Sequence, residues 1–82
     1  MSSMLHLDAL KPGQEGIVQD VLLPPASALR FLEMGLAPGE PVKMIRRAPW
    51  GDPMEVEVMG VRLGIRVADA QDIVVEVTSS TR

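Results

Sequence analysis

Glycine and proline divide this chain into short segments. Seven glycines and seven prolines occur among its 82 residues, and both residue types interrupt regular secondary structure. The segments between them alternate apolar with polar residues, a pattern typical of strands that have one buried face. The sequence therefore predicts a mainly β protein, a small barrel of about five antiparallel strands at residues 15–23, 42–47, 54–59, 61–65 and 73–77.

The clearest strand begins at Met54. The apolar side chains of Met54, Val56 and Val58 alternate with the carboxylates of Glu55 and Glu57. Successive side chains of a strand point to opposite faces of its sheet. We therefore expect the apolar set in the core and the two carboxylates in solvent.

One segment, residues 26–34, has the spacing of a short helix. Leu29 and Leu32 are three residues apart and Leu36 follows four residues later, which places all three on one side of an amphipathic helix. Gly35 stands where a residue of left-handed conformation ends many helices. We therefore expect the leucines to face the core and the helix to end at this glycine.

The length of the chain limits what it can enclose. A chain of 82 residues forms one domain with a thin core, which leaves little room for an enclosed active site. We expect a single domain over residues 1–82, one further helical turn at residues 67–71 and a loose tail at residues 78–82. No apolar run approaches the roughly 18 residues of a membrane span, so we expect no membrane insertion.

Charge and composition exclude several classes of function. Eight basic against eleven acidic residues give a net charge of −3, and the only aromatic residues are Phe31 and Trp50. Nucleic-acid binding relies on a basic field and on stacking rings, so we expect no nucleic-acid partner. The chain has no cysteine, which excludes disulfides and thiol catalysis. Its first residues lack the features of a secretory signal, and we expect a cytoplasmic protein.

The sequence shows no set of residues that could catalyse a reaction. His6 is the only histidine, and Ser27 fits the start of the helix better than a nucleophile. Lys11 and Lys43 lack the glycine-rich approach of a phosphate-binding loop. His6 and Asp8 form a pair without a third metal ligand. We therefore predict no catalytic, cofactor-binding or metal-binding residues and no enzyme.

Two groups of side chains are candidates for binding a partner. On the helix, Phe31 lies off the leucine side and Met34 is three residues further on, so the two form an exposed apolar patch unless the core is wide enough to bury both. Trp50 lies in a turn rich in proline and glycine, where it is either a binding anchor or a lid on the open end of the barrel. Of the two interpretations we prefer the lid. Arg46 and Arg47 lie beside that turn, as a solvated strand end or a docking surface for an acidic partner.

Three glycines are assigned to backbone geometry rather than to binding. Gly35, Gly39 and Gly51 each lie at an expected turn or helix end. Glycine adopts positive φ angles there at no steric cost.

Four segments together resemble one known family. They are R-F-L-E-M-G-L-A-P-G-E-P-V at residues 30–42, L-D-A-L-K-P-G at residues 7–13, A-P-W-G-D-P-M at residues 48–54 and L-G-I-R-V-A-D-A at residues 63–70. Their order and spacing resemble those of the FeoA family, small cytoplasmic accessory proteins of bacterial ferrous-iron uptake, from about residue 5 to residue 77. Phe31 and Asp69 depart from the usual residues of that family.

The resemblance implies a fold, a role and a partner. The fold would be an SH3-like barrel, and the role that of a non-enzymatic helper without a cofactor. The partner would be FeoB, the ferrous-iron transporter with a cytoplasmic GTPase domain, contacted on its cytoplasmic side. Two alternatives remain: an iron-responsive sensor that binds metal through His6 and nearby carboxylates, or a general module that binds peptides or forms homo-oligomers through strand edges.

Overall fold

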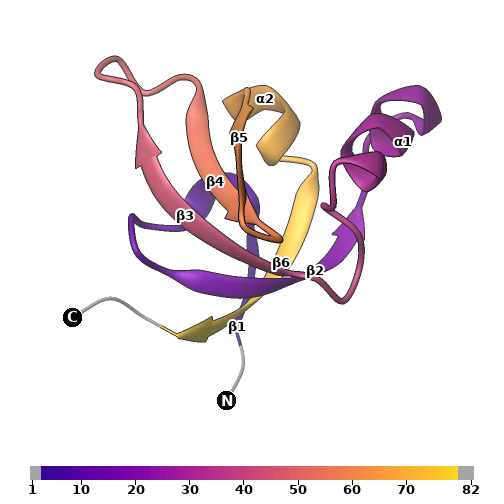
Figure 1. The fold of residues 1–82 in the computed structure, drawn as a ribbon, viewed down its shortest axis with the longest axis horizontal. Helices are drawn as coiled ribbons and strands as arrows, with labels where there is room; N and C mark the ends of the chain where they lie inside the picture. The colour runs from indigo at the N-terminus through magenta and orange to yellow at the C-terminus, as the bar shows by residue number, and fades with distance from the viewer. Residues whose placement is uncertain (1–2, 80–82) are drawn as a thin grey trace.

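The computed structural model describes residues 3–79, which form one curled antiparallel sheet, two helices and a turn of 3-10 helix (Figure 1). The strands are β1 (Ser3–His6), β2 (Glu15–Val21), β3 (Pro41–Arg47), β4 (Met54–Val58), β5 (Val61–Ile65) and β6 (Ile73–Ser79). The helical elements are η1 (Leu7–Ala9), α1 (Pro25–Glu33) and α2 (Val67–Ala70). The predicted mainly β fold, with one short helix and one further helical turn, is confirmed.

The sheet has one strand more than predicted and does not close. Its order is β1-β6-β2-β3-β4-β5, so β1 and β5 are its two free edges. Strand β1 was missed because its pattern is weak: it has four residues, of which only Leu5 is half-buried. Its pairing with β6, from Ser3 opposite Val77 to His6 opposite Val74, joins the two ends of the chain and has no local signal in the sequence.

Alternating side chains of the strands build the core. Met54, Val56 and Val58 of β4 are buried, as the alternation predicted. Residues of the helical elements, of two loops and of β2, β3, β5 and β6 complete the core cluster: Leu7, Leu10, Val18, Phe31, Leu36, Val42, Met44, Ile65, Ala70, Ile73 and Val75. This single cluster fixes the curl of the sheet, because apolar burial is the main favourable term in folding.

Helix α1 turns a different side to the core from the one expected. Phe31 is 3% exposed, whereas Leu29 is 56% exposed and Leu32 is 38% exposed. The prediction of a buried leucine side is therefore wrong for these two residues. The reason is the way the helix ends: the Leu36 amide donates to the Phe31 carbonyl at 3.0 Å and the Gly35 amide donates to the Leu32 carbonyl at 3.1 Å. This termination brings Phe31 and Leu36 together on the buried side.

The ends of the described chain extend the sheet. Strand β6 runs to Ser79, so Thr78 and Ser79 belong to a strand and not to the loose tail that was expected. The rest of that expected tail, residues 80–82, lies outside the described residues. Neither helix of residues 3–79 combines the length and apolar character needed to cross a membrane.

Candidate functional site

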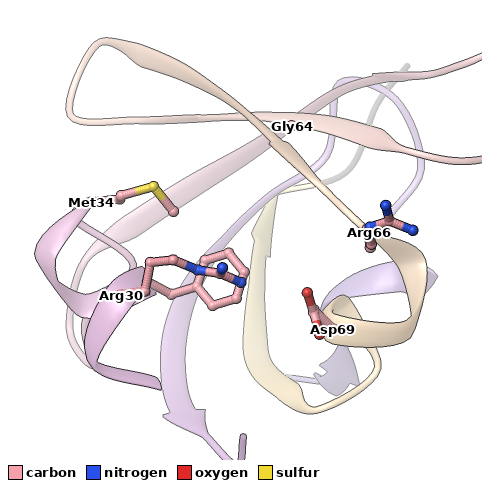
Figure 2. Close-up of a pocket in the computed structure, with 6 residues that line it drawn as sticks. Arg30, Met34, Gly64, Arg66 and Asp69 are labelled. Carbon is pink, nitrogen blue, oxygen red and sulfur yellow. The ribbon is translucent and has the colours of Figure 1, made fainter. Parts of the chain in front are cut away.

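A groove lies between helix α1 and the far end of β5. Figure 2 shows Arg30 and Met34 of α1 on one side and Arg66 and Asp69 on the other, with Gly64 above them. Its volume is about 300 Å³. We call it the α1 groove and define it by its lining residues, Arg30, Phe31, Met34, Gly64, Arg66 and Asp69.

The α1 side of the groove combines a positive charge with an apolar surface. The guanidinium of Arg30 lies 5.1 Å from the centre of the Phe31 ring, a distance at which a cation is attracted to an aromatic face. Phe31 is nevertheless part of the core, and only 3% of it is exposed. Met34, at the end of the helix, is 38% exposed. Of the two residues in the exposed patch predicted on this helix, Met34 is exposed. Phe31 is too deeply buried to act as a free anchor.

Gly35 holds the end of α1 against the hairpin of β4 and β5. Its φ angle is 105°, a value that L side chains rarely adopt. A Cβ at this position would lie 3.0 Å from Val58 Cγ1 and 3.1 Å from Met59 Sδ. The backbone of α1 therefore approaches the hairpin as closely as it does because residue 35 has no side chain.

The β5 side of the groove is open because of Gly64. No heavy atom lies within 4 Å of the position that a Cβ would occupy on this residue. Arg66, two residues after Gly64, is exposed to solvent. The groove thus reaches the backbone of an edge strand without an intervening side chain.

The charges in the groove are unbalanced. It contains the guanidinium groups of Arg30 and Arg66 and the carboxylate of Asp69. The ion pairs found within residues 3–79 join Glu55 to Arg46 at 3.3 Å and to Arg62 at 3.8 Å, so neither groove arginine takes part in them. The groove is locally positive in a chain whose net charge is −3.

Trp50 lies on the turn between β3 and β4 and is 83% exposed. The lid interpretation is therefore wrong: the ring covers nothing in the core. The turn is short, and Gly51 donates its amide to the Ala48 carbonyl at 2.8 Å with a φ angle of 94°. The backbone is held while the indole ring projects, an arrangement suited to a binding anchor.

The two arginines before this turn differ in their contacts. Arg46 is exposed and donates from Nε to Glu55 at 3.3 Å. Arg47 is half-buried and donates to the carbonyl of Asp8 in η1. Arg47 therefore joins β3 to η1 and is not a free docking cation, in contrast to the expectation from sequence. Arg46 remains available at the surface.

The structure does not bring all the predicted candidates together. Met34 lies at the α1 groove, whereas Figure 1 shows the turn between β3 and β4 on the other side of the molecule from α1. Gly35, Gly39 and Gly51 have φ angles of 105°, 93° and 94° and lie at the turns to which sequence assigned them.

Several groove residues were not singled out from the sequence. Arg30, Gly64, Arg66 and Asp69 belong to the groove, but Arg30 is far in the chain from the other three. All four fall within the family-like segments at residues 30–42 and 63–70, which was the only signal that could have found them.

Groups that could hold a metal are a separate question. His6 ends β1 and is exposed, and Asp8 belongs to η1. Within residues 3–79, no three or more His, Cys, Asp or Glu side chains are grouped in a way that could hold a metal ion.

Comparison with known proteins gives a consistent result. The FeoA domain family matches residues 5–77. The FeoA protein of Chlorobium tepidum is 35% identical, with a TM-score of 0.88 over 95% of this chain and 74% of that one. An iron uptake regulatory protein, FeoA, is 29% identical, with a TM-score of 0.81 over 93% of this chain and 99% of that one.

A third similar structure is described as an SH3 domain protein and contains zinc. The FeoA of Stenotrophomonas maltophilia, a prokaryotic SH3 domain protein solved in complex with zinc, is 32% identical. Its TM-score is 0.72 over 87% of this chain and 88% of that one. The curled sheet is thus an SH3-like fold, although its two edges are not joined. Because the family match spans nearly the whole chain, the chain belongs to the FeoA family and is a non-enzymatic accessory protein of ferrous-iron transport.

Proposed function

We propose that this protein docks on the cytoplasmic side of the FeoB ferrous-iron transporter and adjusts its assembly or activity. Membership of the FeoA family supports an Feo-system partner. The observation that carries docking is the 83% exposure of Trp50 on a hydrogen-bonded turn. Tryptophan is enriched among the residues that dominate binding energy, and a ring held out by a fixed backbone loses little entropy on binding.

A second apolar surface supports a docking role. Leu29 and Leu32 of α1 and Met34 directly after it are exposed, as are Met59 and Val61 of the hairpin formed by β4 and β5. Met59 Sδ lies against the backbone at the end of α1. Exposed apolar side chains on neighbouring elements are a feature of interaction surfaces.

Calorimetric titration tests the proposal. The protein is titrated with the soluble GTPase domain of the FeoB transporter from the same organism, with and without guanine nucleotide. We expect saturable heat that depends on nucleotide. Replacing Trp50 with Ala should weaken binding by about 2 kcal/mol, roughly thirtyfold, because a truncated anchor loses its contacts with the partner.

The controls separate binding from folding. Trp50→Phe keeps an aromatic ring and should retain most of the affinity. Neither variant should move the melting temperature measured by circular dichroism, because surface substitutions away from packed features change stability little. Equal affinities for the wild type and Trp50→Ala would exclude Trp50 as the anchor, and absence of heat would exclude the GTPase domain as the docking site.

A further inference from the structure

We propose that the α1 groove binds an extended acidic segment of a partner protein, which adds as a further strand along the free edge of β5. This inference rests on the proposed docking function and specifies the chemistry of the partner at one surface. It combines three observations: an unpaired strand edge, a glycine that opens this edge to a groove, and an excess of arginine around it.

The edge of β5 has backbone groups free for pairing. Strand β5 is the last strand of the sheet. A two-residue turn, Met59 and Gly60, joins it to β4, so the flanking pair Val58–Val61 is hydrogen-bonded and the pairs alternate from there. Arg62 and Gly64 therefore direct their N–H and C=O groups away from β4. Within residues 3–79, no turn or loop hydrogen bond involves these backbone groups.

Gly64 belongs to both the edge and the groove. It is the β5 residue that lines the α1 groove, and the space where a Cβ would lie is empty to 4 Å. An added strand would approach to about 4.8 Å from β5. The groove, at about 300 Å³, has α1 as its opposite wall, where the exposed Met34 offers an apolar surface to one side chain of the segment.

The charges around the edge favour an acidic segment. Within residues 3–79, Arg62, which shares Glu55 with Arg46, and the unpaired Arg66 lie two residues on either side of Gly64, and Arg30 faces the groove from α1. On a strand, residues four apart share one face, so two carboxylates with that spacing would lie opposite Arg62 and Arg66. Asp69 is at the α2 side of the groove (Figure 2), and like-charge repulsion would keep a carboxylate of the segment toward Arg30 and Arg66.

The same charges disfavour a second copy of this chain in the registers centred on Gly64 or on Arg62. If the β5 strands of two copies paired antiparallel with Gly64 opposite Gly64, Arg62 of each copy would lie opposite Arg66 of the other. Centring the pair on Arg62 would place two arginines directly opposite each other. Like charges in opposite positions destabilise a strand pair.

Amide hydrogen exchange and NMR shifts of the full chain test the inference. The probe is the acetylated, amidated nonapeptide Ser-Val-Glu-Val-Thr-Val-Glu-Val-Ser, whose carboxylates are four residues apart. The control peptide has Gln in place of both Glu residues. We expect the acidic peptide to protect the amides of Arg62 and Gly64 from exchange and to shift the Arg30 side-chain resonance, and the control peptide to bind about fivefold more weakly.

Matched variants separate strand addition from charge. Gly64→Pro removes the edge N–H, which makes no bond to β4, whereas Gly64→Ala keeps it and adds a methyl group in empty space. Gly64→Pro should abolish protection at Arg62, and Gly64→Ala should retain binding. Arg66→Gln should weaken the acidic peptide about fivefold, and Lys11→Gln, outside the groove, should leave it unchanged. If Gly64→Pro does not fold, the loss of peptide affinity in Arg66→Gln still tests the inference.

Each outcome decides one question. No protection at millimolar peptide, or equal binding of both peptides, would overturn the inference. Protection that rises with protein concentration in the absence of peptide would assign the edge to a second copy and would also overturn it. If the acidic peptide binds but the GTPase domain gives no heat, the GTPase domain is not the docking partner, and the inference about the groove is retained. If the GTPase domain binds equally to the wild type and to Gly64→Pro, the docking function stands without the groove.

Discussion

Gly35 is constrained both by its own backbone conformation and by its neighbours. It combines a φ angle of 105° with a distance of only 3.0 Å between Val58 Cγ1 and the position that a Cβ would occupy. Gly35→Ala should therefore lower the free energy of unfolding by about 2 to 4 kcal/mol, the sum of backbone strain and overpacking. Urea unfolding followed by circular dichroism measures this change.

Two other glycines provide the matched controls for that substitution. Gly39 and Gly51 have φ angles of 93° and 94° but no heavy atom within 4 Å of a Cβ. Alanine at either position should lower the free energy of unfolding by about 1 to 2 kcal/mol, because only the backbone strain is then present. Equal losses at all three positions would show that close approach between α1 and the hairpin contributes nothing.

Single residues also mark the limit of sequence-based prediction. The turn glycines were predictable because positive φ has a local chemical cause. Phe31 was not, because α1 has only nine residues and carries apolar side chains on more than one side. Its buried side was decided by the helix end and by the sheet beneath it. The environments of Trp50 and Arg47 were mispredicted for the same reason, since η1 and the curl of the sheet lie outside their local sequence.

At the scale of elements, the hairpin of β4 and β5 contains one unfavourable residue. Met59 has a φ angle of 53° and precedes Gly60, whose φ angle is 78°. Turns with two positive φ angles strongly prefer Asn before Gly. Met59→Asn should therefore raise the free energy of unfolding by about 0.5 to 1 kcal/mol, as relief of backbone strain at this position.

The control for that substitution removes another exposed methionine. Met4 lies in β1 and is 57% exposed, and Met4→Asn should give no gain because strands disfavour Asn. Both variants are compared by thermal melts. A lower melting temperature for Met59→Asn would mean that the contact of Met59 Sδ with Gly35 outweighs the strain in the turn.

Elements were predictable where their pattern was local. Strand β4 was clear because its alternation lasts five residues with both faces marked, and α2 was clear because so few residues separate β5 from β6. Strand β1 was not predictable, since it pairs with β6 at the other end of the chain. The α1 groove was equally hidden, because it forms where two distant segments meet.

At the scale of the whole molecule, the sheet remains open and its surface chemistry is uneven. Within residues 3–79 the edges β1 and β5 are unpaired, Leu29 and Leu32 of α1 are exposed, and a positive groove lies in a chain of net charge −3. A stable domain with these features is suited to contact another protein. Family membership assigns the chain to ferrous-iron transport, and we propose that the exposed surfaces are where it docks.

The most direct test of this account is binding of the full chain to the complete FeoB transporter, held in lipid nanodiscs, by calorimetric titration. Use of the complete transporter presents every cytoplasmic surface at once. We predict saturable binding that Trp50→Ala weakens and that Lys11→Gln leaves unchanged. Absence of binding by a chain shown to be folded by circular dichroism would contradict the docking role.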